Sequence, residues 1–301
     1  MKIDLCIATF RRPMLADTLA SLGNARIPPG TALRVIVVDN DHTPSARANA
    51  EAAGQQAGLT LSYVHAPAAN ISLARNAGLE AARADWIAFL DDDEIVTADW
   101  LAELVRCAKK TGADAVFGPS EPIYPPGTPD WIAQGAFHRQ SVPLRGGRAE
   151  TGHTCNALVR MGGTPWAAQR FDLSLGQSGG EDTQFFAALF AQGARFHVTG
   201  TAAVREIVTP DRLTFRWLAQ RRFRIGQTYG ALAQGVAAKS LRFGLAAAKA
   251  GYCAAGAALC LHNAVARNGW ALRGVMHWGV CAGCLPHRKP ALYGASEPAA
   301  D

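Results

Sequence analysis

The chain has 301 residues, of which 49% are hydrophobic and 18% are charged, so it is long enough for one large domain, or a domain with a small appendage, around a well-buried core. Its formal net charge is +6, but no recognisable nucleic-acid-binding module accompanies that charge, so no nucleic acid is expected as a partner. Its seven cysteines are scattered along the chain, which argues against a disulfide framework and indicates a reducing compartment.

The N-terminal part of the chain alternates between strand-like and helix-like patterns. Apolar runs predict strands, and leucines at helical spacing or alanine-rich stretches predict the helices between them. The predicted strands cover residues 3–9, 33–38, 59–65 and 86–90, and the predicted helices begin at Pro13 and cover 46–57 and 70–84. Because the links are short, this pattern predicts an α/β fold with a doubly wound, mostly parallel sheet.

The middle of the chain continues with shorter elements. A helix is expected over 99–110 and a strand over 114–118, whereas the proline-rich stretch 119–129 predicts an irregular loop. Residues 146–161 predict a loop followed by a strand, and a last helix of this part is expected over 183–192.

An acidic cluster follows the predicted strand 86–90. The residues Asp91, Asp92, Asp93 and Glu94 come directly after it, and no lysine or arginine lies within the run. Open α/β sheets bind ligands at the carboxyl ends of their strands, where the second strand also delivers an aspartate, Asp39. Hard oxygen ligands in this number favour Mg²⁺ or Mn²⁺ together with substrate phosphates. The alternative is an acidic loop that only caps the next helix.

A second acidic pair, Glu181 and Asp182, follows two glycines and opens a predicted helix. Acids at a helix N-terminus are favourable with the helix dipole, so capping alone explains one of them. Two adjacent acids after Gly179 and Gly180 are more typical of a site held close to a ligand.

Several motifs in order carry a resemblance to a known family. They are Ala8 to Pro13, Val37 to Asn40, Ala74 to Gly78 (an ARNxG segment), Leu90 to Asp93 (a DXD motif) and Gly179 to Asp182. Together they make residues 1–230 resemble the family-2 glycosyltransferases, which have the GT-A fold, a Rossmann-like sheet flanked by helices. Residues 201–229 are similar to exopolysaccharide glycosyltransferases of the succinoglycan-assembly type.

The resemblance implies roles for the donor-binding residues. A nucleotide sugar would contact the side chains after the first two strands, the ARNxG arginine and the acidic cluster: Thr9, Arg11, Asp39, Arg75, Asp91 and Asp92. Of these, Arg75 would pair with a phosphate or with the metal-site acids. Asp93, with Asp91, would hold a Mn²⁺ or Mg²⁺ ion.

The resemblance also implies an inverting transfer. Asp182 would be the catalytic base that deprotonates the acceptor hydroxyl, and Glu181 would orient the acceptor or support that base. The metal ion would stabilise the departing nucleoside diphosphate. The sequence departs from the family pattern at Arg205, where a histidine is expected before Glu206, which leaves the role of that histidine unfilled.

The expected activity is therefore that of a metal-dependent inverting hexosyltransferase, with a UDP-linked hexose as donor and a lipid-linked saccharide of cell-surface polysaccharide synthesis as acceptor. A catalytically inactive nucleotide-sugar-binding protein is the first alternative, although a pure binder has no use for the base Asp182. A sugar nucleotidyltransferase is the second. Such enzymes open with a glycine-rich loop, and Thr9 to Pro13 contains no glycine.

The expected domains are a catalytic domain over 1–225, with a nucleotide-sugar-binding half (1–118) and an acceptor-binding half (119–225), and a helical C-terminal region over 226–301. Residues 250–266 lack formally charged side chains other than His262 and predict a buried or interfacial helix rather than a spanning one. Basic and tryptophan side chains near this run favour peripheral contact with an anionic membrane; they are Arg242, Lys249, Arg267, Arg273, Trp270 and Trp278.

The expected location is the cytoplasm, with peripheral contact to the inner face of the cytoplasmic membrane, because the sequence begins directly with a strand rather than a signal peptide. The pair Cys281 and Cys284 is the one closely spaced pair of cysteines, and without a second such pair it is only weak support for zinc or redox chemistry.

Overall fold

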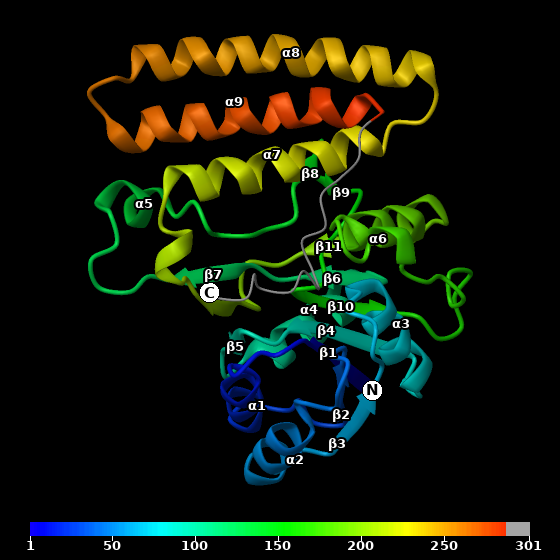
Figure 1. The fold of residues 1–301 in the computed structure, drawn as a ribbon. Coiled ribbons are helices and arrows are strands. Elements are labelled where there is room, and N and C mark those ends of the chain that lie inside the picture. Colours follow the sequence, from blue (N-terminus) through cyan, green and yellow to red (C-terminus); the bar gives the residue numbers. More distant parts are fainter. Residues whose placement is uncertain (287–301) are drawn as a thin grey trace. The chain divides into compact units, whose positions relative to one another are not determined.

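The computed structural model describes residues 1–286, which fall into two compact units (Figure 1). Unit 1 comprises residues 1–121 and 140–206, and unit 2 comprises residues 122–139 and 207–286. The predicted division into a catalytic domain and a C-terminal region is a functional one, and it stays a prediction.

The main sheet of unit 1 is mostly parallel, as predicted. Among residues 1–286 it has seven strands, in the order β11-β6-β10-β4-β1-β2-β3, and of these only β10 runs antiparallel to its neighbours β4 and β6. The strands are β1 (Lys2–Thr9), β2 (Ala32–Asp39), β3 (Leu61–His65), β4 (Trp86–Asp91), β6 (Ala115–Phe117), β10 (Asn156–Arg160) and β11 (Phe196–Val198).

Both faces of this sheet are buried. Along β1, Leu5 and Ile7 belong to one hydrophobic cluster, whereas Cys6 between them belongs to the other. Because successive side chains of a strand point to opposite faces, this division means that apolar layers cover the sheet on both sides. The helices of unit 1 are α1 (Leu15–Gly23), α2 (Arg47–Gln56), α3 (Ile71–Ala81), α4 (Trp100–Thr111) and α6 (Glu181–Ala191).

The helix α6 begins two residues earlier than predicted, so Glu181 and Asp182 lie in its first turn. The loop predicted over 119–129 is wrong in part, because β7 (Ser120–Ile123) forms a small sheet in the order β5-β12-β7, with β5 (Glu94–Val96) and β12 (Val204–Ile207). A short antiparallel pair is formed by β8 (Leu144–Arg145) and β9 (Arg148–Ala149). Short 3₁₀ turns occur at Leu173–Leu175 and Pro210–Arg212.

Unit 2 is helical. It contains α5 (Asp130–Gly135), α7 (Phe215–Ala231), α8 (Val236–Leu259) and α9 (Ala264–Cys284), and α9 packs against both α7 and α8. The backbones of α7 and α9 touch at glycines: a Cβ atom on Gly226 would overlap the Met276 carbonyl oxygen, and one on Gly279 would overlap that of Phe223. Only glycine therefore permits this close approach.

The prediction of one helix over 250–266 is wrong. The chain turns after Leu259, and Asn263 caps the next helix by accepting a hydrogen bond from the Ala266 amide at 2.9 Å. None of the helices within residues 1–286 combines the length and the apolar character that a membrane-crossing helix needs. Cys281 and Cys284 are buried on α9, and their thiols face the carbonyl oxygens of Phe243 and Gly230.

Candidate functional site

The strand register of unit 1 brings the predicted site segments to one edge of the sheet. Thr9 at the end of β1 pairs with Asp39 at the end of β2, and Ala8 pairs with Asp91 at the end of β4. The prediction that two strands deliver aspartates to the same edge is therefore confirmed.

Asp39 itself is fully buried and organises the loop after β2. One carboxylate oxygen accepts the Asp41 amide at 3.0 Å, and the other accepts the Ala46 amide at 2.8 Å and the Tyr63 hydroxyl at 2.6 Å. These bonds fix the path from β2 into α2. The predicted contact of Asp39 with a nucleoside stays a prediction, and here its oxygens are engaged within the chain.

Arg11 lies at the surface of the same edge, in the left-handed backbone region with φ of 54°. Its guanidinium donates to Asp41 Oδ1 at 3.0 Å, and this hydrogen bond holds the pKa of Asp41 at about 2. Asp41 was not among the predicted site residues, although it stands directly after Asp39 and Asn40 in the sequence. The ion pair makes the ionised Asp41 a fixed neighbour of Arg11.

Asp92 is buried, whereas the side chain of the preceding Asp91 is partly exposed. Its Oδ2 accepts the Thr9 hydroxyl at 2.6 Å, so the two predicted donor-binding residues bind each other. Burial raises the pKa of Asp92 to about 6, and Asp93 adds to the rise. The side chain of Asp93 lies near Arg12, with 4.0 Å between the charged atoms.

A carboxylate pair from the small sheet adds to this cluster. Glu94 of β5 stands directly opposite Glu206 of β12, and both are buried. Like charges opposite each other across strands are unfavourable, and burial together with Asp91 raises the pKa of Glu94 well above its ordinary value. Arg205, where a histidine is expected from the resemblance, lies opposite Ile95 and is exposed.

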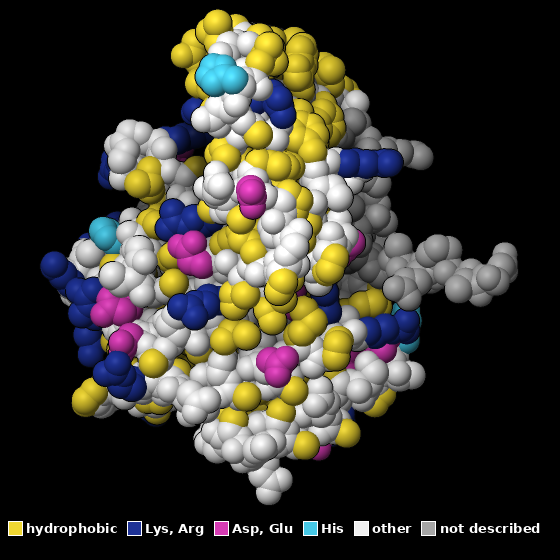
Figure 2. Space-filling view, turned by 90° about the vertical axis from the view of Figure 1, so that its left-hand side faces the viewer, with side chains coloured by type: hydrophobic (Ala, Val, Ile, Leu, Met, Phe, Trp, Pro, Cys, Tyr) yellow, Lys and Arg dark blue, Asp and Glu magenta, His cyan; other side chains and the backbone are white. Residues whose placement is uncertain are grey.

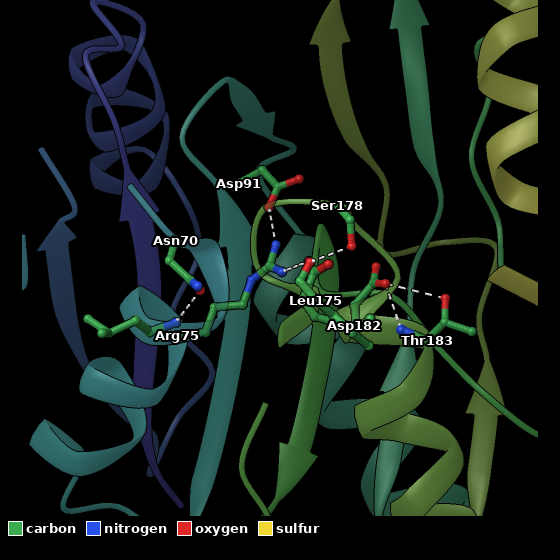
Figure 3. A network of polar contacts seen from close by, with 9 residues as sticks. Asn70, Arg75, Asp91, Leu175, Ser178, Asp182 and Thr183 are labelled. Carbon is green, nitrogen blue, oxygen red and sulfur yellow. Dashed lines mark hydrogen bonds and ion pairs between the residues drawn. The ribbon is translucent and has the colours of Figure 1, made fainter. Parts of the chain in front are cut away.

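Arg75 connects the acidic cluster to the second acidic pair. Its guanidinium donates to Glu181 Oε1 and, at 3.5 Å, to Asp91 Oδ1, as Figure 3 shows for Asp91. The predicted pairing of Arg75 with the acids of the strand end is therefore present, whereas its pairing with Glu181 was missed. Desolvation by the surrounding protein raises the pKa of Asp91 to about 7, although the positive charge of Arg75 opposes the rise.

The backbone around α3 explains why Arg75 reaches both partners. Asn70 caps α3 by accepting the Leu73 amide with its side chain at 3.1 Å (Figure 3). The backbone amide of Asn70 donates to Asn40 Oδ1 at 2.6 Å. The Ile71 amide donates to the Gly176 carbonyl at 3.1 Å. A Cβ atom at Gly176 would overlap the Asn70 side chain, so glycine lets the segment before α6 lie against α3.

Glu181 and Asp182 face different partners. Glu181 is buried with one oxygen on Arg75, and its Oε2 has no hydrogen-bond partner among residues 1–286. Burial raises the pKa of Glu181, and the adjacent Asp182 adds to the rise. Asp182 is half-buried, and its Oδ1 accepts the Thr183 amide at 2.6 Å and the Thr183 hydroxyl at 3.3 Å (Figure 3).

The chemistry of the acidic cluster fits a hard divalent cation completed by a substrate. Within residues 1–286, no group of three or more His, Cys, Asp or Glu side chains is arranged so that it could hold a metal ion. Mg²⁺ is typically bound by one or two carboxylates plus substrate phosphates. Asp91, which is partly exposed, and Asp93 are carboxylates of that kind, two residues apart at the strand end.

The comparisons with known proteins agree with the motifs. The family model described as Glycosyl transferase family 2 matches residues 4–174. The chain is 45% identical to the succinoglycan biosynthesis protein ExoM of Rhizobium meliloti (strain 1021) over 301 residues, which is 99% of this chain and 97% of the relative. The predicted resemblance to the succinoglycan type is therefore confirmed.

Solved structures share the fold at low identity. The mannosyltransferase PcManGT from Pyrobaculum calidifontis, in complex with GDP-Man and Mn²⁺, matches with a TM-score of 0.64 and 18% identity, covering 93% of this chain and 86% of that one. S. aureus TarS 1-349 in complex with UDP-GlcNAc matches with a TM-score of 0.54 and 14% identity, covering 92% and 90%. The match to the longer TarS chain spans 55% of that chain.

Proposed function

Because the chain belongs to glycosyl transferase family 2 and has the GT-A fold, we propose that it transfers a hexose from a nucleotide sugar to an acceptor hydroxyl with inversion at the anomeric carbon. The proposed donor is a UDP-hexose. The proposed acceptor is a lipid-linked saccharide at the inner face of the cytoplasmic membrane, reached from the cytoplasm.

The observation that carries this proposal is the position of Arg75 between Asp91 and Glu181. It joins the end of β4, where the donor diphosphate is expected, to the first turn of α6, where the acceptor is expected. A transfer reaction needs both substrates at one point, because positioning supplies much of its rate. An inactive nucleotide-sugar binder has no need for the second half of this arrangement.

Asp182 is the proposed base. Its hydrogen bonds from Thr183 fix the orientation of its carboxylate, which would accept the proton of the acceptor hydroxyl during attack on the anomeric carbon. Glu181 holds the first turn of α6 through Arg75 and so acts as a positioning residue. Direct attack needs one base and a leaving diphosphate, so no second carboxylate serves as a covalent nucleophile.

The donor side of the proposal uses the strand ends. Asp91 and Asp93 would hold Mn²⁺ or Mg²⁺, which supplies Lewis-acid stabilisation to the departing diphosphate. Thr9, Asp39 and Asp92 shape the nucleoside side of the site, where Arg11 presents its guanidinium at the surface. The neighbours with GDP-Man and with UDP-GlcNAc differ in the base of their donors, so the base is best identified by direct binding.

The relative named for succinoglycan biosynthesis supports a polysaccharide precursor as acceptor. Lipid-linked precursors lie at a membrane surface, and peripheral contact of the C-terminal region, residues 226–301, with that surface would bring the enzyme to them.

Calorimetric titration with UDP, GDP and dTDP, each with and without Mn²⁺, tests the donor side. We expect one nucleotide, UDP, to bind tightly only with metal, and Asp93→Asn to weaken this binding by about tenfold or more. Glu80→Gln, which removes an exposed carboxylate of α3, is the matched control and should bind like the unchanged protein. Absence of metal-dependent binding for all three nucleotides would contradict the proposal.

A further inference from the structure

The outer face of α8 exposes large apolar side chains. Leu241 is 66% exposed, Leu245 54%, Tyr252 70% and Leu259 79%. Figure 2 shows hydrophobic side chains gathered at the top of the view, where Figure 1 draws α8 and α9. Single exposed apolar residues are ordinary, but a row of them along one helix marks an interaction surface.

The spacing of these side chains places them on one face. With the exposed Ala248 and Ala255 they follow each other at intervals of three or four residues, which is the repeat of one side of an α-helix. The opposite side of the helix carries the buried Ala246, Ala250 and Cys253. The helix is therefore apolar on both sides, and within residues 1–286 its inner side is the one that is buried, in the packing against α9.

The charges around this face have one sign. The sequence contains no Asp or Glu between residues 212 and 286, whereas α8 carries Lys239, Arg242 and Lys249. Lys239 and Lys249 are exposed, and Arg242 donates to the Tyr229 carbonyl at 2.6 Å. A second copy of this chain would bring lysines against lysines. An anionic lipid surface offers complementary charge to the lysines and an acyl boundary to the leucines.

We propose that the outer face of α8 docks the protein onto an anionic membrane, with the helix lying in the plane of the lipid headgroups. This rests on the proposed function, since a lipid-linked acceptor is what makes such docking useful. The surface differs from the one expected from the sequence: Trp270 on α9 packs edge-on against Tyr252, with 5.5 Å between ring centroids, and fills the space beside Gly256.

The test is flotation of the full chain with vesicles of phosphatidylethanolamine and phosphatidylglycerol, compared with vesicles of phosphatidylcholine alone. We expect binding to the anionic vesicles, reduced by roughly tenfold or more in the double variant Leu241→Asp with Leu245→Asp. Leu144→Asp, at a side chain 55% exposed in unit 1, is the matched control and should float like the unchanged protein. Circular dichroism checks that each variant keeps its helix content.

Charge-reversal variants test whether the lysines of α8 contribute to vesicle binding. Lys239→Glu with Lys249→Glu should weaken binding to anionic vesicles by about tenfold. Binding to phosphatidylcholine vesicles, which we expect to be weak, should not change. Lys109→Glu with Lys110→Glu, at the exposed end of α4, is the control with the same change in net charge. Equal loss in both charge variants would overturn the assignment to α8, because net charge alone would then explain it.

Two further outcomes would overturn the proposed membrane docking of α8. Failure of the unchanged protein to float with anionic vesicles would overturn the proposal, as would a dimer in sedimentation equilibrium that the Leu241→Asp and Leu245→Asp variant abolishes. Calorimetry with UDP and Mn²⁺ on the same samples separates this result from the enzyme proposal. Intact nucleotide binding without flotation removes only the docking surface, whereas flotation without nucleotide binding removes only the transferase.

Discussion

The sheet edge of unit 1 and the outer face of α8 in unit 2 depart from ordinary protein surfaces in opposite ways. At the edge, carboxylates such as Asp92, Glu94 and Glu181 are buried close together, and burial raises their pKa values. On α8, large apolar side chains stand in water beside lysines. Neither arrangement is favoured by folding alone, because buried charge and exposed apolar surface both cost free energy.

The buried carboxylates and the exposed apolar side chains would be stabilised by different partners. A divalent cation would offset the excess of carboxylates, with a diphosphate completing its coordination, whereas a lipid surface would cover the exposed leucines. We therefore expect the proposed functions of this protein to depend on the two regions where the chain keeps an unfavourable arrangement, and the effects of substitution there to be larger than elsewhere.

The substitution Asp182→Asn should remove the proposed base. We expect the rate of sugar transfer to fall by about 10²–10⁴-fold, because general-base catalysis typically contributes that much. Transfer of labelled hexose from UDP-hexose to the lipid fraction of bacterial membranes measures it. UDP binding should stay within about twofold of the unchanged protein, since the role proposed for Asp182 is on the acceptor side. Full retention of transfer would assign the base elsewhere.

The substitution Arg75→Met should leave Glu181 buried without a counter-charge. Breaking a buried pair in this way costs about 3–5 kcal/mol, so the midpoint of urea unfolding should fall markedly at pH 7. Arg26→Met, which breaks the exposed pair with Asp99, is the control and should change stability by less than about 1 kcal/mol.

A companion variant tests the cause of the Arg75 effect. Combining Arg75→Met with Glu181→Leu removes both charges, and we expect much of the lost stability to return, because a buried pair replaced by apolar groups is often neutral. A double variant as unstable as Arg75→Met alone would show that packing, and not the unpaired carboxylate, is responsible.

Two Gly→Ala substitutions in unit 2 have the smallest expected effects on stability, and they introduce the same methyl group at two different sites. Gly279→Ala should destabilise the packing of α9 on α7 by about 1–3 kcal/mol, because the new Cβ overlaps the Phe223 carbonyl. Gly251→Ala on α8 meets no atom within 4 Å, so the gain in helix propensity should stabilise by about 1 kcal/mol. Thermal unfolding followed by circular dichroism compares them, and equal effects of the same sign would contradict the close backbone contact.

Much of unit 1 could be predicted from the sequence. The long apolar runs of β1, β2 and β4 identify central strands, and the rule that parallel strands end at one edge places Asp39 near Asp91, as the register confirms. The motifs then predict the GT-A fold, which the solved neighbours confirm. The apolar runs and the motifs each lie within a short stretch of the chain, so they can be recognised from the sequence alone.

The remaining features depend on contacts between distant segments. The strands β5, β7 and β12 have only three or four residues each, and pairing with one another, rather than any periodic pattern, makes them strands. The contact of Arg75 with Glu181 requires the segment before α6 to lie against α3, which the single residue Gly176 permits. The break before α9 did have a signal, the capping residue Asn263, but the uncharged run on both sides of it concealed the turn.

The antiparallel strand β10 has a consequence for the order of folding during synthesis. It lies between β4 and β6, although it follows both in the chain. The parallel strands β1 to β4 can pair as soon as they leave the ribosome, but one edge of β4 stays open until residues 156–160 emerge. An open apolar strand edge is prone to aggregation. Nascent chains that stop before residue 156 should therefore need a chaperone, whereas chains that include β11 should not.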